Sequence, residues 1–339
     1  MFSVATALTD KGLTGLWKSH LFFALVGFFI TGIILLLHFR LFERLAYFLY
    51  AVGLGLLAAV LVFGSSALGA KRWLNLGGFS FQPSEMMKLL LVFALAKYYH
   101  NDRGAGNYPL RELIIPTILT IVPVGLIMMQ PDLGTAIILL AAFASMTLFA
   151  GINTKSIFIL IITGLLLLPV VYNYGLKDYQ KQRIHTFIDP MSDPKGAGYN
   201  SLQSMIAIGS GKIIGKGYRK GTQSKLSFLP EQQTDFSFSV YNEEHGLIGS
   251  LVLLSLYSFI FLRGLKIAYS SNDKFGTLMA IGILSIMFWH VFINMMMTMG
   301  LLPIVGIPLP FMSYGGTALM VFMTSIAIIT NISNKKPMF

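Results

Sequence analysis

Residues 113–150 read LIIPTILTIVPVGLIMMQPDLGTAIILLAAFASMTLFA and contain a single charged side chain, Asp132. The tripeptide Gln130-Pro131-Asp132 divides the stretch into two apolar runs. A helix of roughly 20 apolar residues crosses the hydrocarbon core of a bilayer while satisfying its own backbone hydrogen bonds. The stretch therefore predicts two membrane-spanning helices, 113–129 and 132–150, joined by a short polar turn.

Apolar runs of similar length recur on both sides of this pair. Hydrophobic residues make up 55% of the 339 residues and charged residues only 12%, which leaves too little polar surface for a water-soluble enzyme. The absence of cysteine excludes disulfides, iron–sulfur clusters and thiolate zinc sites. We predict an all-α polytopic membrane protein, organised as a single transmembrane domain over residues 1–339. The nine predicted spans are 21–38, 45–64, 84–99, 113–129, 132–150, 156–174, 246–263, 276–297 and 314–332.

The basic residues set the predicted orientation. The formal net charge is +11, from 25 Lys and Arg against 14 Asp and Glu. With a cytoplasmic C-terminus, eleven Lys and Arg residues fall in inner segments and four in the short outer segments. Short cytoplasmic loops are enriched in these residues, so the count favours an outer N-terminus. The surplus charge is then explained by loops and anionic membrane lipid, with no nucleic acid partner.

The segment 175–243 is far longer than a connection between packed helices requires. Disorder is one interpretation of its high content of Gly, Lys, Asp and Gln. The helix-like stretch Leu202–Ile208 and the alternating apolar positions Leu226, Phe228, Phe236 and Phe238 favour a folded structure against the membrane. We predict a large extracytoplasmic loop.

Glu85 and Lys88 lie three residues apart at the start of a predicted span, so they share one face of the helix. An ion pair would offset the cost of burying both charges. A structural pair is the simpler interpretation, because a paired acid is a poor proton acceptor. Direct participation in chemistry is the alternative.

Asp132 stands at the first turn of the predicted span 132–150. Its carboxylate can accept hydrogen bonds from the unpaired backbone N–H groups of that turn. It could equally hold a cation or a sugar hydroxyl, because ionisable groups rarely enter membranes without a function. The sequence leaves both interpretations open.

Asp235 lies between Thr234 and Phe236 in a polar stretch before the next span. Partial burial beside an aromatic ring would raise the affinity of this acid for a proton, which suits a general base. A solvated loop acid is the more common outcome for such a residue, and composition does not decide between them.

Lys71 and Arg72 precede another outer, glycine-containing stretch, and Asn294 and residues 300–316 add polar, Gly and Pro residues on the same side. Irregular backbone at membrane depth is tolerated where it lines a cavity, and cations there favour a phosphate-bearing ligand. We predict that these clusters, the acids and the long loop converge on one extracytoplasmic cavity.

Two other signals are weaker. Residues 209–212, Gly-Ser-Gly-Lys, match neither the dinucleotide nor the Walker spacing, so they indicate a turn-rich basic loop. The six histidines show no metal-ligand spacing.

Several motifs occur in a fixed order: Phe81-Gln82-Pro83-Ser84-Glu85, Gln130-Pro131-Asp132-Leu133-Gly134-Thr135, Gly198-Tyr199 with Gln203-Ser204, Gly221-Thr222-Gln223-Ser224, Leu229-Pro230-Glu231 with Thr234-Asp235-Phe236, and Gly300-Leu301-Leu302-Pro303 through Ser313-Tyr314-Gly315-Gly316. Together they resemble the SEDS family (shape, elongation, division and sporulation) over essentially the whole chain. The fourth motif makes the resemblance closer to the rod-shape branch than to the division branch.

The resemblance implies a peptidoglycan glycosyltransferase of the bacterial cytoplasmic (inner) membrane that polymerises lipid II for cell elongation and rod shape. Its active site would lie on the extracytoplasmic face. Asp235 matches the family's essential catalytic acid and would deprotonate the 4-hydroxyl of the acceptor N-acetylglucosamine. That oxygen would attack C1 of the donor N-acetylmuramic acid, with undecaprenyl diphosphate leaving and a β-1,4 bond forming. One base suffices for this single displacement, unlike the acid pair of a glycosidase.

On the same resemblance, Lys88, Lys71 and Arg72 are candidates for binding the diphosphate or organising the cavity, with Glu85 orienting Lys88. A divalent cation shared by Asp132 and the diphosphate is a further hypothesis, with no decisive ligand spacing, and no other cofactor is expected. The implied protein partner is a class B penicillin-binding protein, a transpeptidase, at the late spans and the long loop. The other supporting residues are Gln82, Thr234 and Ser313.

The chain departs from the family at its N-terminus. Family members have ten spans with both ends cytoplasmic, whereas this chain begins in what matches the first outer loop, so a first helix is expected to be missing. The alternative function is a transporter that flips a lipid-linked precursor, because polar groups inside a helical bundle also mark substrate pathways. Ionisable groups that gather at the outer end favour the enzyme.

Overall fold

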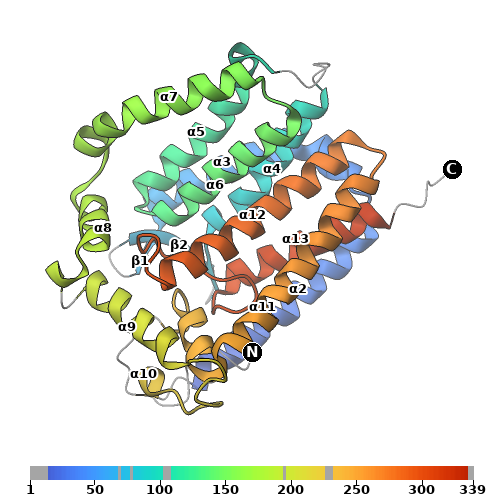
Figure 1. The fold of residues 1–339 in the computed structure, drawn as a ribbon. Helices are drawn as coiled ribbons and strands as arrows, with labels where there is room; N and C mark the ends of the chain where they lie inside the picture. Colours follow the sequence, from blue (N-terminus) through green and yellow to red (C-terminus); the bar gives the residue numbers. More distant parts are fainter. Residues whose placement is uncertain are drawn as a thin grey trace. The chain divides into compact units, whose positions relative to one another are not determined.

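The computed structural model describes residues 14–67, 70–76, 79–101, 108–193, 196–225 and 232–334. These residues are predominantly helical (Figure 1). Each of the nine predicted spans coincides with a helix. Among the described helices, seven are long and apolar enough to cross a membrane. The prediction of an all-α polytopic membrane protein is confirmed.

The chain folds as two compact units that alternate along the sequence. Helices α11 (Ser237–Ser270) and α12 (Lys274–Thr298) each contribute residues to both units. The first unit contains Met1–Ser19, Thr154–Ser258 and His290–Tyr314, and the second contains His20–Asn153, Phe259–Trp289 and Gly315–Phe339.

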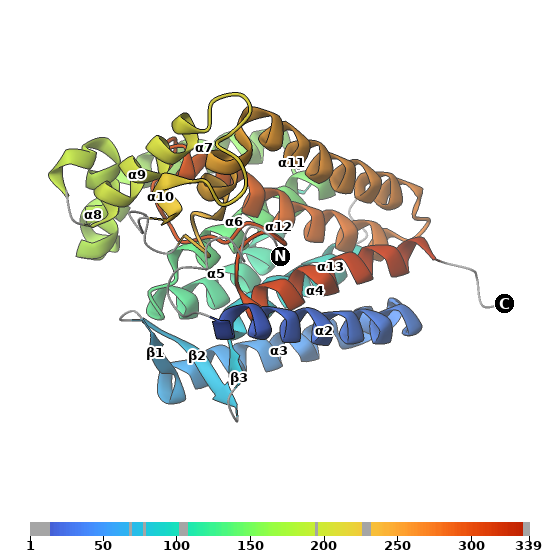
Figure 2. The same cartoon turned by 90° about the horizontal axis from the view of Figure 1, so that it is seen from below.

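In the second unit, helix α4 (Pro83–Asn101) is the central element. It packs against four other helices, α3, α5, α6 and α13 (Figure 2). Nearly all of its side chains are buried, including the polar ones in its first turns, as expected for a helix enclosed by others. The remaining elements are α2 (Thr14–Leu36, which belongs to this unit from His20 on), α3 (Arg40–Phe63), η1 (Leu110–Leu113), α5 (Ile114–Met129), α6 (Leu133–Ala150) and α13 (Gly316–Ser333).

A small antiparallel sheet that the sequence analysis did not predict connects α3 to α4. Its strands are β1 (Ser65–Ala67), β2 (Ala70–Leu76) and β3 (Phe79–Phe81), in the order β1-β2-β3. Strand β2 contacts both α3 and α4, and Figure 2 shows the sheet beside the end of α3. The sheet matters for the site because β2 carries Lys71 and Arg72.

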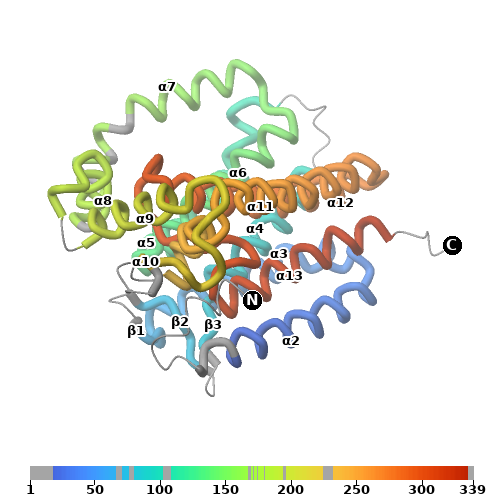
Figure 3. The backbone as a smooth tube through the Cα atoms, turned by 60° about the horizontal axis from the view of Figure 1, so that its bottom comes forward, coloured from blue at the N-terminus to red at the C-terminus, as the bar shows by residue number. Residues whose placement is uncertain are grey.

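In the first unit, the predicted long loop is folded wherever the structure describes it. Residues 202–208, predicted to be helical, lie within α9, and Figure 3 follows the chain from α8 through α9 to α10. Leu226, Phe228 and the motif at 229–231 lie outside the described residues. The elements are α7 (Thr154–Val170), η2 (Val171–Gly175), α8 (Asp178–Ile188), η3 (Pro190–Ser192), α9 (Ala197–Ser210) and α10 (Thr222–Lys225).

Helix α11 begins at Ser237, well before the predicted start of the span at residue 246. The difference arises at Glu243 and Glu244, whose charges lower the hydropathy of the sequence and hide the helix there. In the structure both side chains are buried and accept hydrogen bonds, so the helix runs through them. It is interrupted at Gly246, whose φ of 63° is not helical.

Candidate functional site

The predicted site residues fall into two groups, one in each unit. The first unit holds Thr234, Asp235 and Ser313. The convergence of both groups on one cavity stays a prediction. The second unit holds Lys71, Arg72, Gln82, Glu85, Lys88 and Asp132.

The backbone of Asp235 is held by a buried amide. Asp235 and Thr234 lie in a turn just before α11, and both are half-buried. The Nδ2 atom of Asn294, on α12, donates to the Asp235 carbonyl oxygen at 3.0 Å and to the Ile307 carbonyl oxygen at 2.7 Å. Asn294 is fully buried. The position of Asp235 is therefore fixed from α12.

The segment after α12 supports the same turn at two further points, and one of these is fixed by a bond within the segment. The backbone N–H of Tyr314 donates to the Gln233 carbonyl oxygen at 2.7 Å. The hydroxyl oxygens of Ser237 and Ser313 lie 2.7 Å apart, and Ser313 accepts the backbone N–H of Leu309 at 2.8 Å. Ser313 is buried, and its contacts hold the end of this turn in place.

The backbone at Gly306 lies close to the Asp235 carboxylate. A Cβ atom added at Gly306 would stand 3.3 Å from Asp235 Oδ2. The next residue, Phe236, is buried and packs with Val240 and Ile304. The aromatic neighbour predicted beside the acid is therefore part of a small core, while Asp235 itself keeps partial exposure through which a ligand can reach it.

Arg183 is a candidate that the sequence analysis did not single out. It lies on α8, and its Nη1 atom donates to the carbonyl oxygen of Ile304 at 3.0 Å. Because Ile304 packs against Phe236, this guanidinium reaches the segment that supports the Asp235 turn. The only signal in the sequence is a cation within a helix-like stretch of the long loop, which does not distinguish it from the neighbouring cations.

Asp132 caps helix α6, as one of its two interpretations proposed. Its carboxylate accepts the backbone N–H of Thr135 at 3.2 Å and the Thr135 hydroxyl at 2.9 Å. It also accepts Gln82 Nε2 at 3.1 Å and the Ser84 hydroxyl at 3.2 Å. The backbone N–H of Gln82 in turn donates to the hydroxyl of Thr317 on α13. With four donors around a buried carboxylate, this geometry favours capping over ligand binding.

Glu85 and Lys88 form the predicted ion pair. Glu85 Oε2 and Lys88 Nζ are 2.7 Å apart, and their side chains are 5% and 0% exposed. The Lys88 ammonium also lies 5.6 Å from the centre of the Phe322 ring. Such burial suits the structural interpretation, in which the pair fixes the start of α4.

Arg72 and Lys71 differ in their surroundings. Arg72 donates through Nε to the Gln130 carbonyl oxygen at 3.3 Å and through Nη2 to the Pro131 carbonyl oxygen. It therefore ties β2 to the turn that carries Asp132. Lys71, on the same strand, is exposed. Lys71 is therefore the more accessible of these two predicted phosphate ligands.

No cluster of three His, Cys, Asp or Glu side chains that could hold a metal ion occurs among the described residues. The hypothesis of a divalent cation shared by Asp132 and the diphosphate stays a prediction.

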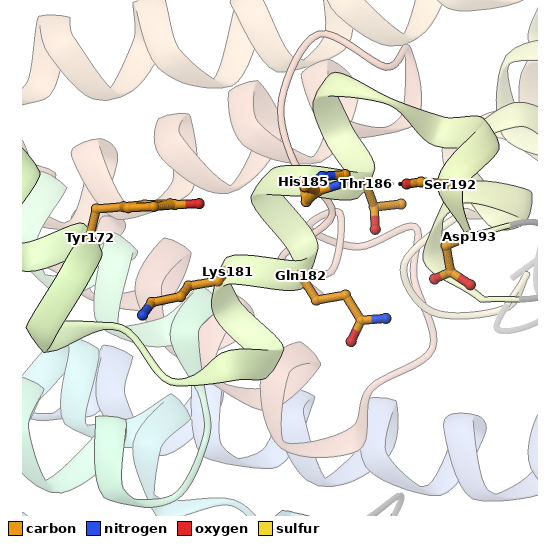
Figure 4. A pocket seen from close by; sticks show the side chains of 7 residues that line it. All are labelled: Tyr172, Lys181, Gln182, His185, Thr186, Ser192 and Asp193. Carbon is orange, nitrogen blue, oxygen red and sulfur yellow. Dashed lines mark hydrogen bonds between the residues drawn. The ribbon is translucent and has the colours of Figure 1, made fainter.

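A hollow of about 360 Å³ lies in the first unit, mainly along α8 (Figure 4). Figure 4 shows the Lys181 side chain extending towards Tyr172. The Lys181 Nζ atom lies 5.9 Å from the centre of the Tyr172 ring. None of the predicted site residues lines it, so we assign it no role in the chemistry. The lining residues are Tyr172, Lys181, Gln182, His185, Thr186, Ser192 and Asp193.

Comparison with known sequences gives consistent matches over almost the whole chain. Residues 1–337 match the model of the FtsW, RodA and SpoVE family, described as a cell cycle protein. The peptidoglycan glycosyltransferase MrdB of Escherichia coli (strain K12) is 42% identical over 299 residues, 88% of this chain and 80% of the relative. The probable peptidoglycan glycosyltransferase FtsW of Geobacter sp. (strain M18) is 36% identical over 322 residues, 94% of this chain and 86% of the relative.

Solved structures match as well. A chain from a study of the structural coordination of polymerization and crosslinking by a peptidoglycan synthase complex superposes with a TM-score of 0.84 and 28% identity, covering 100% of this chain and 97% of the other. The rod shape determining protein RodA of Thermus thermophilus superposes with a TM-score of 0.72 and 26% identity, covering 98% and 92%.

Proposed function

Because this chain belongs to the FtsW, RodA and SpoVE family, we propose that it is a peptidoglycan glycosyltransferase that polymerises lipid II. The observation that carries the proposal is the 42% identity with MrdB over 88% of the chain. The 36% identity with FtsW is lower. Together with the likeness to a rod shape determining protein, this favours a function in cell elongation and rod shape.

The proposed reaction joins two lipid-linked sugars in one displacement. The 4-hydroxyl oxygen of the acceptor N-acetylglucosamine attacks C1 of the donor N-acetylmuramic acid and loses its proton to the Asp235 carboxylate. The bond from C1 to the diphosphate breaks, and undecaprenyl diphosphate leaves with the electron pair. Attack from the opposite face converts the α-linked donor into a β-1,4 bond. A positioned general base typically contributes about 10²- to 10⁴-fold to such a step.

The surroundings of Asp235 support its assignment as the base. Its backbone is held by Asn294, its neighbours are tied to the segment after α12, and its side chain is half-buried. A base must keep its position while the acceptor binds, because a small misplacement can reduce turnover strongly. The hydrogen-bonded backbone holds the carboxylate in position, and its partial exposure leaves it accessible to the acceptor.

The cations divide into different proposed roles. Lys88 is buried against Glu85, and Arg72 is bonded to two carbonyl oxygens, so we assign both to the support of the helices around Asp132. Lys71 and Arg183 have partial or full exposure and are the candidates for neutralising the leaving diphosphate. Arg suits this role because its guanidinium can pair with two phosphate oxygens.

Orientation and partnership complete the proposal. Asp235 and the long segment 175–243 would lie on the extracytoplasmic face of the cytoplasmic membrane, where lipid II is polymerised. A class B penicillin-binding protein would supply the crosslinking activity. The likeness to a chain of a peptidoglycan synthase complex supports this partnership.

The central experiment measures glycan polymer made from purified lipid II by the full chain, with and without the transpeptidase. We expect Asp235→Asn to lose at least about 100-fold in rate, because the amide cannot accept the proton. Asp178→Asn is the matched control, since Asp178 is an exposed acid of the same unit. Full activity of Asp235→Asn would remove Asp235 from the chemistry.

The same preparation separates the enzyme from a transporter. In liposomes loaded with labelled lipid II, a flippase would move the label between leaflets without forming polymer. Translocation without polymer would replace the glycosyltransferase proposal by the transporter.

A further inference from the structure

The chain between α9 and α10 forms a loop with an unusual surface. We call residues 211–221, Gly-Lys-Ile-Ile-Gly-Lys-Gly-Tyr-Arg-Lys-Gly, the basic loop, since it contains four cations and no acid. The side chains of Ile213 and Ile214 are 63% and 78% exposed. Lys212, Arg219 and Lys220 are exposed beside them. Two adjacent exposed isoleucines flanked by cations require an explanation.

Backbone hydrogen bonds fix the basic loop to α11 at its interruption. The N–H groups of Leu247 and Ile248 donate to the carbonyl oxygens of Lys212 and Ile213 at 2.9 and 3.1 Å. The approach is close at Gly246, where an added Cβ would lie 2.4 Å from the backbone nitrogen of Gly215. The loop therefore satisfies the N–H groups that the interruption of the helix leaves unpaired.

Two buried carboxylates hold the rest of the loop. Glu243, fully buried, accepts Lys216 Nζ at 2.8 Å and the backbone N–H of Thr222 at 2.8 Å. Glu244 accepts the backbone N–H of Arg219 at 3.0 Å. Lys216 is thus paired with a buried carboxylate, whereas Lys212, Arg219 and Lys220 are exposed on the surface.

The loop meets α11 at the edge of its membrane-spanning part. The helix has 34 residues, more than the roughly 20 that cross a hydrocarbon core, and the part after Gly246 is long enough alone. Leu247 and Ile248 are both 53% exposed, and Leu251 and Val252 are exposed one turn further on. This surface faces lipid in a membrane-spanning helix, and Ile213 and Ile214 extend it beyond the interruption.

We propose that the basic loop is an interfacial anchor for the leaflet on the Asp235 side of α11. Ile213 and Ile214 enter the acyl-chain boundary, and Lys212, Arg219 and Lys220 bind the phosphates of anionic phospholipid headgroups. Apolar side chains flanked by cations are typical of segments that lie in the membrane interface, and basic residues there are attracted to anionic lipid. The anchor is independent of the glycosyltransferase assignment, since it needs only the membrane.

The absence of native cysteine allows a direct test with single introduced thiols. The full chain carrying Ile214→Cys is labelled with an environment-sensitive fluorophore and placed in nanodiscs that contain lipids brominated at known depths. We expect strong quenching by bromines near the headgroup end of the acyl chain. Leu251→Cys marks a lipid-facing site, and Asp178→Cys marks an exposed position next to the exposed Lys177 in the same unit. An Ile214 label that is quenched no more than the Asp178 label would overturn the proposal.

The headgroup contact is tested by replacing phosphatidylcholine with phosphatidylglycerol in the same nanodiscs. Quenching at Ile214→Cys should increase with phosphatidylglycerol, and the increase should disappear when Lys212, Arg219 and Lys220 are all changed to Glu. Equal quenching in both lipids would show that the three cations do not bind headgroup phosphates. Quenching lost only when the transpeptidase is added would instead assign this surface to a protein partner.

Discussion

The Nδ2 atom of Asn294 donates to the backbone carbonyl oxygen of Asp235 at 3.0 Å and, at the same time, to that of Ile307 at 2.7 Å. One buried nitrogen therefore joins α12, the Asp235 turn and the segment that follows α12. A buried donor shared by two acceptors is costly to lose, because both carbonyl groups would then be left without this partner.

Asn294→Asp tests this relationship with almost no change in volume. The new carboxylate would face two carbonyl oxygens with acceptor atoms only, so we expect a loss of roughly 1 to 3 kcal/mol in stability and a fall in polymerisation beyond it. The measurements are thermal unfolding in detergent and the polymerisation rate per folded molecule.

Asn331→Asp is the matched control, because Asn331 Nδ2 also donates to two carbonyl oxygens, those of Ile34 and Leu37. It should lose similar stability but keep its rate per folded molecule. Equal losses of rate in both variants would show that Asn294 acts through global stability and has no special effect on Asp235.

Gly306→Ala tests how closely the backbone approaches the proposed base. The new methyl group would lie 3.3 Å from Asp235 Oδ2, and the φ of 74° is unfavourable for alanine. Gly217→Ala introduces comparable backbone strain at a φ of 97°, with the flexible side chain of Lys220 as its nearest neighbour at 3.5 Å. Both variants should lose about 1 to 2 kcal/mol in stability.

Only Gly306→Ala should lower the turnover of lipid II, because only it crowds the carboxylate. Single-turnover measurements on the two variants check this expectation. A normal rate in Gly306→Ala would mean that the space beside Asp235 is not needed during the reaction.

The spans were predictable because each depends on a local property, the length of an apolar run. The run from Leu113 to Ala150 gave two helices whose junction at Gln130-Pro131-Asp132 lies where the structure has it. The pairing of Glu85 with Lys88 was predictable for the same reason, since three residues along a helix place two side chains on one face.

The supports of Asp235 were not predictable, because they join residues far apart in the chain. The hydrophobic pattern along the chain does not relate Asn294 to Asp235 or Arg183 to Ile304. Alternation and helical periodicity report only on residues that are close in sequence. The burial of Glu243 was hidden for a related reason. Its partners, Lys216 and Thr222, lie between the end of α9 and the start of α10, in a stretch whose course the sequence does not specify. Hydropathy alone therefore started the helix too late in the chain.

Arg183→Gln tests the cation that reaches the Ile304 carbonyl group. If this guanidinium neutralises the diphosphate, its loss should raise the KM for lipid II and lower kcat, by at least about tenfold in kcat/KM. Lys181→Gln is the control, since Lys181 lies on the same helix and its ammonium donates to Asn173. Arg183→Lys should recover part of the activity, because the charge is kept while the paired geometry is lost. Equal kinetics for both Gln variants would exclude Arg183 as a diphosphate ligand.

The Glu85 and Lys88 pair can be assigned to structure or to chemistry by a double-mutant cycle. Either Glu85→Gln or Lys88→Met alone leaves one buried charge without its partner, which should destabilise the protein by about 3 to 5 kcal/mol. The double variant removes both charges and should recover most of that loss, because neither group is then buried in ionised form. Thermal unfolding of the four proteins gives the coupling energy.

Polymerisation by the same four proteins decides the role. A structural pair predicts that activity follows stability, so the double variant regains a rate close to that of the parent protein. A stable double variant without polymerisation would instead show that Lys88 contacts the substrate during turnover. We expect recovery, because Lys88 is 0% exposed and lies 2.7 Å from Glu85, where a bound diphosphate would have to displace an existing buried partner.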